Sequence, residues 1–346
     1  MIFDVTDDFA LNAMALRIGQ RDAILVNGGL AIALFALFSK FMCHSDIFPW
    51  IGAPQSEHVS VAPLEGFPDS FTNEFSTLFA TSGADPARFV EALRPQVLPE
   101  QRGDITVRKI ARQPVCSIDI AEHLPADAER RHFAVKLWQW AMCFVLYHEL
   151  AHIMRGHVDY LMSVHRAQGL PEIGRTGNAD LSRSQEFQAD MYAAVATLLP
   201  LFTIKSDANR GRKVYAWGFT AAVLFSLLRA LEGTKIADAE RTHPPALDRL
   251  TVCALGATTR ARMLDMGGDD MFGDAIRGFF DVDRLLPSIV PGRYTSLVRE
   301  GGAPQGIGIP AGPLMANYLQ HDAWRRFDRL EGVVENIPVT MLIPYE

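Results

Sequence analysis

The sequence is poor in cysteine and in basic residues, and these shortages exclude several classes of protein. Its four cysteines lie far apart in 346 residues and form no C-x-x-C pair; they are Cys43, Cys116, Cys143 and Cys253. Such a pattern is typical of a reducing compartment and not of a disulfide-linked secreted domain. Lys and Arg number 33 against 40 Asp and Glu, which gives a formal net charge of −7. Because the phosphate backbone selects basic surfaces, we expect no nucleic-acid partner.

The sequence also lacks an apolar run long enough to be a clear membrane span. The longest candidate, 23–38 (AILVNGGLAIALFALF), has 16 residues where about 20 are usual, and Asn27-Gly28-Gly29 interrupts it. We interpret this run, like the shorter runs 191–204 and 216–228, as helices of a large core. The acidic N-terminus has no basic region, so a cleaved signal peptide is not expected. We predict a cytoplasmic protein, with an inner-membrane anchor through residues 23–39 as the alternative.

The periodicity of the chain predicts a mainly helical α+β protein with a small β-sheet before its central helix. Residues 1–50 are expected to form two or three helices, and the proline- and glycine-rich residues 51–70 a linker. Alternating residues at 105–110 and 115–120 predict two strands whose edge could bind an extended substrate. Further helices are expected over 74–93, 126–156 with a break near Arg130, 182–199 with a capping box at Ser182 and Gln185, 214–231, and a short one from Thr242.

One motif carries metal chemistry. The segment His148-Glu149-Leu150-Ala151-His152 lies late in an apolar helix, and residues four apart project from the same helical face. Both imidazoles can therefore bind one ion, for which zinc is the natural choice, and Glu149 stands where it can take a proton from an activated water. The alternative is a pair of exposed histidines, but the apolar flanking residues predict burial.

A catalytic zinc site needs a third protein ligand, and three residues compete for this place. On a continuous helix His157 and Asp159 would point away from the two histidines, and the metzincin positions hold an arginine and a valine instead of glycine and histidine. Glu186 on the next helix is the better candidate. Asp190 shares its helical face and can accept the remaining N–H of a ligand histidine. The alternative for both acids is a solvated acidic stripe.

A further candidate is His243, in the segment Thr242-His243-Pro244-Pro245. The following proline holds the histidine backbone extended, so its imidazole could approach the site and hydrogen-bond an oxyanion. An exposed histidine at the start of a helix is the equally open alternative.

Three segments, HELAHIMRGH, QEFQAD and THPPALDRL, resemble in order and spacing the gluzincin metallopeptidases related to the HtpX heat-shock protease and the CAAX prenyl endopeptidases. The resemblance covers about residues 137–255, and a similarity to the Lit-type phage-exclusion peptidases is more distant. Many family members carry several membrane spans, unlike this chain. The resemblance implies a zinc ion held by His148, His152 and Glu186, with Glu149 as general base, Asp190 supporting a ligand histidine and His243 as a weaker catalytic candidate.

The sequence therefore predicts a zinc-dependent endopeptidase acting on protein or peptide substrates. Its zincin-like metallopeptidase domain is expected at 71–260, between an N-terminal helical segment and linker at 1–70 and a glycine- and proline-rich accessory region at 261–346. Two alternatives stay open. One is a zinc-binding regulatory module without catalytic activity, and the other is a membrane-anchored quality-control protease.

Overall fold

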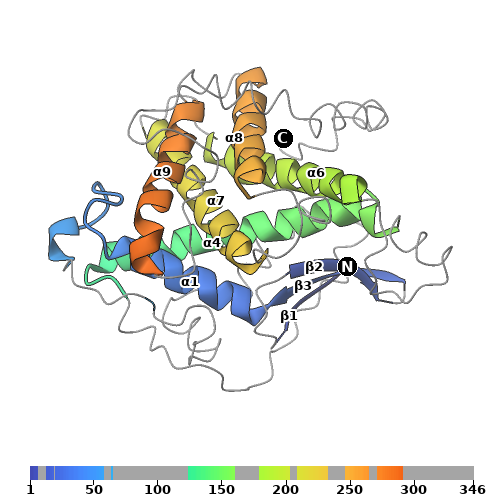
Figure 1. Cartoon of the computed structure of the whole chain (residues 1–346), viewed down its shortest axis with the longest axis horizontal. Coiled ribbons are helices and arrows are strands. Elements are labelled where there is room, and N and C mark those ends of the chain that lie inside the picture. Colours follow the sequence, from blue (N-terminus) through green and yellow to red (C-terminus); the bar gives the residue numbers. More distant parts are fainter. Residues whose placement is uncertain are drawn as a thin grey trace.

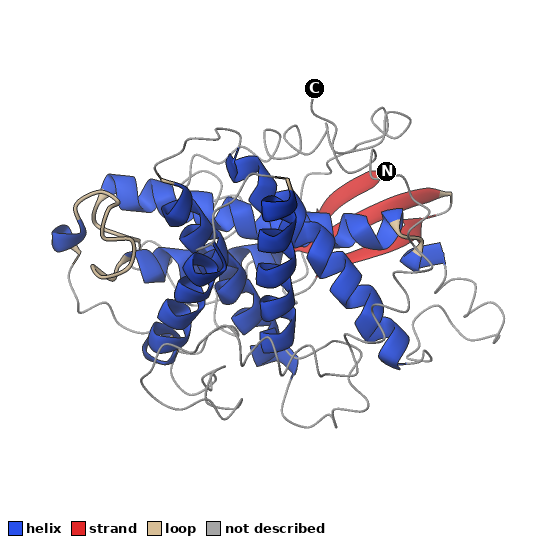
Figure 2. Cartoon of the chain, turned by 90° about the horizontal axis from the view of Figure 1, so that it is seen from above, coloured by secondary structure: helices blue, strands red, loops and turns tan. Residues whose placement is uncertain are grey.

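The computed structural model describes residues 1–6, 13–18, 20–57, 64, 124–159, 179–202, 209–232, 246–264 and 271–290. This part of the chain is mainly helical with a small sheet before the helices, so the predicted α+β class is confirmed (Figure 1). Seen from above, the strands lie at one end of the molecule (Figure 2). The elements are β1 (Ile2–Thr6), β2 (Ala13–Ile18), β3 (Arg21–Asn27), α1 (Gly28–Met42), η1 (Pro54–Ser56), α4 (Ala128–Met154), α6 (Ala179–Leu198), η5 (Leu199–Phe202), α7 (Arg210–Glu232), α8 (Ala246–Met263) and α9 (Met271–Ile289).

The sheet contains three strands in the order β1-β3-β2. The central strand β3 pairs in parallel with β1 and antiparallel with β2, and in the second pair Ala15 lies opposite Ile24. Among the described strands β2 therefore has one side without a strand partner, and its backbone groups on that side are turned away from β3.

These strands contradict the expected two or three helices in residues 1–50. The periodicity from which we expected helices there is outweighed by the alternation of β2 and by the β-branched residues Ile24 and Val26 of β3, which fit a pleated surface. Both side chains are buried in the core. Helix α1 begins directly after Asn27, so Asn27-Gly28-Gly29 joins a strand to a helix and does not join two helices.

The apolar run 23–38 is divided between β3 and α1, so its interpretation as core helix is right only for the second part. All residues of α1 are buried, including Lys40 near its end. Burial lowers the pKa of Lys40 to about 8. None of the helices that the structure describes combines the length and the apolarity needed to cross a bilayer.

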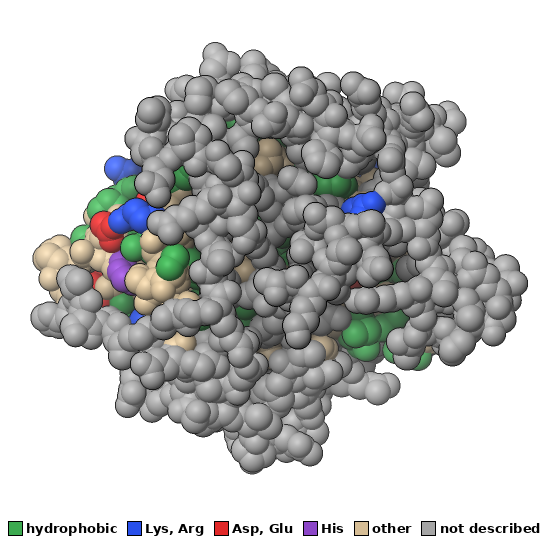
Figure 3. Space-filling view, viewed as in Figure 1, with side chains coloured by type: hydrophobic (Ala, Val, Ile, Leu, Met, Phe, Trp, Pro, Cys, Tyr) green, Lys and Arg blue, Asp and Glu red, His purple; other side chains and the backbone are tan. Residues whose placement is uncertain are grey.

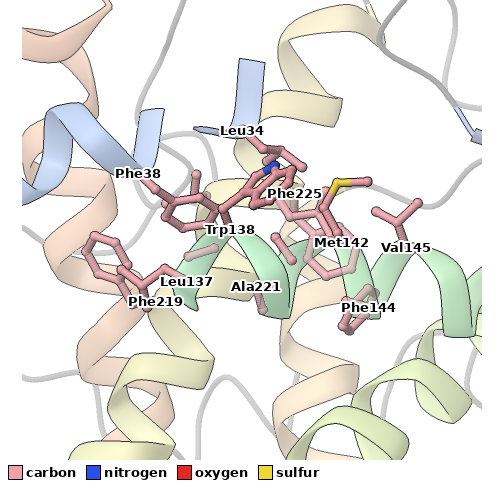
Figure 4. Close-up of a cluster of buried hydrophobic side chains, with 14 of the residues drawn as sticks. Leu34, Phe38, Leu137, Trp138, Met142, Phe144, Val145, Phe219, Ala221 and Phe225 are labelled. Carbon is pink, nitrogen blue, oxygen red and sulfur yellow. The ribbon is translucent and has the colours of Figure 1, made fainter. Parts of the chain in front are cut away.

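Helix α4 runs through the middle of the structure, where α1, α6 and α7 pack against it (Figure 1). It is continuous, so the predicted break near Arg130 is wrong. The helix starts at Ala128 because the Asp127 side chain caps it, accepting a hydrogen bond of 2.9 Å from the backbone N–H of Arg130. Figure 4 shows the core between three helices, filled by Leu34 and Phe38 from α1, Leu137, Trp138 and Met142 from α4, and Phe219 and Phe225 from α7.

Helices α7 and α9 approach each other closely through two glycines. A Cβ atom on Gly218 would collide with the backbone of Ala275, and one on Gly278 with the backbone of Tyr215 and Phe219. Without side chains at these two positions the helices pack backbone to backbone, which fixes α7 and its core-facing side chains.

The other helix boundaries partly follow the predictions. Helix α7 confirms the expected helix at 214–231, and α8 begins after the proline pair but is 18 residues long and not short. Helix α6 begins at Ala179, before Ser182, so the predicted capping box at Ser182 is wrong. The predicted helix 74–93 and strands 105–110 and 115–120 lie outside the described residues.

The described helices share one hydrophobic cluster. Buried residues of α1 and α9 belong to the same cluster as those of α4, α6, α7 and α8. The boundaries of the three predicted regions, 1–70, 71–260 and 261–346, stay a prediction, although the strands and the buried α1 correct the helical description of the first.

The surface near η1 carries charges of both signs. In the space-filling view, basic, acidic, histidine and apolar side chains are intermixed on the end of the molecule where η1 lies (Figure 3). Arg284 of α9 lies 2.8 Å from Asp46 after α1, with both side chains about half exposed, and the Arg212 guanidinium lies 5.2 Å from the ring centre of Trp50. Exposed pairs of this kind contribute little to stability, about 0–1 kcal/mol each.

Arg130 is a fully buried cation that ties the start of α4 to the segment after α1. The Glu57 carboxylate lies 3.7 Å from its Nε and accepts hydrogen bonds of 2.9 and 3.0 Å from the backbone N–H groups of Ala126 and Asp127. The guanidinium donates hydrogen bonds of 2.8–3.1 Å to the carbonyl oxygens of Met42, His44, Ile47, Phe48 and Ile51. This buried network orients α1 and α4 relative to each other.

We predict that Arg130→Met lowers the free energy of unfolding by about 3–5 kcal/mol, because it leaves the buried Glu57 carboxylate without its cationic partner and removes a donor from several buried carbonyl groups. Urea unfolding followed by circular dichroism measures the change. Lys136→Met, at an exposed position of the same helix, is the matched control and should change stability by less than about 0.5 kcal/mol. Similar losses in the two variants would contradict the role assigned to Arg130.

Candidate metal centre

The two motif histidines lie in the last two turns of α4 with their rings together. Nε2 of His148 lies 3.1 Å from Nε2 of His152, and the side chains are 11% and 14% exposed. The spacing of four residues therefore brings both imidazoles to one point, as predicted, and the alternative of an exposed pair is wrong.

Glu186 on α6 reaches both imidazoles. Its Oε2 lies 3.4 Å from Nε2 of His148, and its Oε1 lies 3.6 Å from Nε2 of His152. Bonds of about 2.1 Å at tetrahedral angles would separate two zinc ligand atoms by about 3.4 Å, so these distances fit one ion. The three residues form a group that can hold a metal, with the mixed imidazole and carboxylate donors typical of catalytic zinc sites.

Asp190 contacts His148 on the side of the ring away from Glu186, and Arg249 binds Asp190. Oδ1 of Asp190 lies 2.9 Å from Nδ1 of His148, although the N–H of the ring does not point straight at it. Arg249 on α8 holds Asp190 with two hydrogen bonds, 2.7 Å from Nε and 2.8 Å from Nη2, and Nη2 also lies 3.4 Å from Oε2 of Glu186. Both acids are thus engaged by buried cationic or imidazole groups, and neither belongs to a solvated stripe.

The surroundings of the two histidines shift their pKa values in opposite directions. Burial opposes a charge on His148, but the adjacent carboxylates of Asp190 and Glu186 raise its pKa to about 10. Burial and the positive His148 lower the pKa of His152 to about 3. One positive charge is therefore favoured between the rings and the carboxylates, the place where the distances also fit a cation.

Glu149 is buried beside this group and contacts the sheet. A backbone hydrogen bond from Ala15 of the strand β2 reaches its carboxyl group. Burial raises the pKa of Glu149 to about 7, with an opposing influence of His148 and a further increase from Glu186. A carboxyl group that exchanges its proton near neutral pH is suited to general base catalysis.

His157 lies closer to the site than the sequence indicated. Helix α4 ends at Met154, and Gly156 with a φ of +72° turns the chain, so the assumption of a continuous helix through His157 is wrong. Nδ1 of His157 lies 3.0 Å from Nδ1 of His152, and its Nε2 lies 3.1 Å from Oε1 of Gln188 on α6. His157 is not in the candidate ligand group, so it contacts a candidate ligand instead of being one.

The remaining sequence candidates lie elsewhere. Asp159 pairs with Arg17 of β2 at 2.8 Å and is mostly exposed, outside the candidate ligand group. His243 lies outside the described residues.

Sequence reasoning missed two residues of the site. Arg249 stands in the THPPALDRL segment, but nothing in its local spacing marks it as the partner of an acid on another helix. Gln188 shares α6 with the two acids, but it lies two residues from each, a spacing that puts it on another helical face, so no local signal marked it.

Comparison with known proteins agrees with this site. Residues 109–262 match the family model described as Peptidase U49, a family of Lit-type peptidases. No curated protein and no solved structure matches the chain. The matched residues contain α4 and α6 and nearly all of α8, whereas the specific relation to HtpX and to the CAAX prenyl endopeptidases stays a prediction. Over these residues, which carry the candidate metal centre, the chain is similar to a peptidase family.

Proposed function

We propose that the chain is a zinc-dependent endopeptidase in which His148, His152 and Glu186 hold the metal and Glu149 is the general base. The observation that carries this proposal is the convergence of three candidate ligands from two helices at distances that suit one ion, with a buried acid beside them. The match to a peptidase family over the same helices supports hydrolysis of peptide bonds.

Zinc bound in such a site supplies Lewis-acid activation of water, lowering the pKa of that water to about 7, and a positive charge for the developing oxyanion. The protein side chains do the rest. Glu149 accepts the proton of the attacking water and passes it to the nitrogen of the leaving amine. Asp190, fixed by Arg249, holds His148 in orientation, and the apolar residues of α4 exclude bulk water behind the two imidazoles.

The position of strand β2 favours the proposal that the substrate is an extended peptide. It lies at the edge of the described sheet, and its Ala15 backbone reaches the carboxyl group of Glu149. Extended peptides add to such edges through main-chain hydrogen bonds. A peptide lying along β2 would pass the proposed general base, which is the binding mode that we first expected for the strands at 105–120.

The first test removes the general base. We predict that Glu149→Gln keeps the zinc content of the wild-type protein but loses at least about 100-fold in hydrolysis of labelled casein, because a neutral amide cannot accept a proton. Elemental analysis and initial rates measure the two properties. Glu129→Gln, at an exposed position in the first turn of the same helix, is the matched control and should behave as wild type. Full activity of Glu149→Gln would contradict the assignment, and zinc binding without hydrolysis by wild type would favour the regulatory module.

The second test addresses the third ligand. A strong chelator should abolish hydrolysis, and added zinc should restore it. Glu186→Gln should bind zinc at least about tenfold more weakly, because an amide oxygen replaces an anionic ligand. Competition with a chromogenic chelator measures the dissociation constant, again with Glu129→Gln as the control. An unchanged zinc affinity of Glu186→Gln would remove this residue from the ligand set.

A further inference from the structure

His157 is a buried polar residue that the proposed chemistry does not use. Its side chain follows the turn at Gly156 and is directed back against His152, with the two Nδ1 atoms 3.0 Å apart. The residue is 5% exposed, so bulk water does not supply hydrogen bonds to its ring. A buried imidazole needs hydrogen-bonding partners. Whether each partner donates or accepts determines which of the two ring nitrogens carries the hydrogen.

The geometry of His152 decides which nitrogen must carry its proton. Its Nε2 faces Nε2 of His148 and Oε1 of Glu186, so this is the atom that the site offers to a metal. A neutral imidazole binds metal only through the nitrogen that has no hydrogen. The hydrogen of His152 must then lie on Nδ1, where it can be donated to Nδ1 of His157.

Gln188 lies at the other end of this series of hydrogen bonds and requires the same placement of hydrogens. Its Oε1 lies 3.1 Å from Nε2 of His157, and a carbonyl oxygen can only accept a hydrogen bond. His157 therefore carries its hydrogen on Nε2 and keeps a free lone pair on Nδ1 for the N–H of His152. If Gln188 presented its NH2 group instead, each bond would reverse and the hydrogen of His152 would move to Nε2, the metal-facing nitrogen.

We propose that His157 and Gln188 are positioning residues that hold His152 in the tautomer with Nε2 free to bind a cation. This inference builds on the proposed function, because it assigns a purpose to the tautomer only if the site holds a metal. The two ligand histidines are then supported differently. His148 is backed by the Asp190 carboxylate and its Arg249 partner, whereas His152 is backed by a neutral chain.

The test compares four variants of the full chain with wild type, and a fifth variant serves only to assign a spectrum. His157→Leu and Gln188→Met remove the acceptors, whereas His157→Asn places a carbonyl oxygen near the position of Nδ1 and is the conservative variant. Gln185→Met is the matched control, since it changes a partly buried glutamine on the same helix. The dissociation constant for zinc is measured by chelator competition. The tautomer of His152 is read in the chelator-treated protein from long-range ¹H–¹⁵N spectra, with the signal assigned by its loss in His152→Asn.

We expect His157→Leu and Gln188→Met to bind zinc about 10–100-fold more weakly and to lose the Nδ1–H tautomer of His152. His157→Asn should recover most of the affinity and of the tautomer, and Gln185→Met should match wild type in both. A purely structural role would lower the melting temperature in His157→Leu and His157→Asn alike without this rescue.

Two results would overturn the inference. One is zinc affinity within about threefold of wild type in both His157→Leu and Gln188→Met, with an unchanged tautomer, which leaves the proposed function standing. The other is an Nε2–H tautomer of His152 in the wild-type protein. Absence of zinc binding by wild type would contradict the proposed function instead, and the tautomer measurement would still decide the positioning of His152.

Discussion

The contact between the carboxylates of α6 and the imidazoles of α4 is the constraint on which the site depends. Asp190 and Arg249 are almost fully buried, and a charge of either sign could not lie there alone. Each group is compensated by the next, from His148 through Asp190 to Arg249, so α4, α6 and α8 must keep one relative position. The opposing glycines fix α7 against α9, and the buried network of Arg130 fixes α1 against α4, so the helices packed around the cluster keep their relative positions.

The candidate ligand group was predictable because it follows from helix periodicity. His148 and His152 are four residues apart, and so are Glu186 and Asp190, so each pair shares a helical face wherever its helix packs. Arg249 was not predictable in this way, because its partners lie on another helix and no local spacing marks an arginine that will be buried. His157 was expected to point away from the site because we assumed a continuous helix through it, and this assumption was wrong. A glycine follows Arg155 there, which is a signal for the end of a helix.

The N-terminal sheet was missed for a different physical reason. Residues 13–27 are short apolar segments, and periodicity alone does not separate a buried strand from part of a buried helix. What decides between them is the pairing of β1 with β3, about twenty residues apart in sequence. The sheet bears on the proposed function because it brings the backbone of Ala15 to Glu149, a contact that no motif in the sequence indicates. Fold class was therefore accessible from the sequence, while the strand that meets the site was not.

The distribution of charge around the candidate ligands suits the chemistry proposed for them. Asp190 is neutralised by Arg249, and the chain from His152 through His157 to Gln188 is neutral, so neither support adds net charge to the site. Glu186 is then the one anionic member of the candidate ligand group. A divalent cation held by two neutral imidazoles and one carboxylate keeps a net positive charge, and this charge is what polarises water and stabilises an oxyanion. Had Asp190 been left without Arg249, its negative charge would have opposed that effect from about the distance of one imidazole ring.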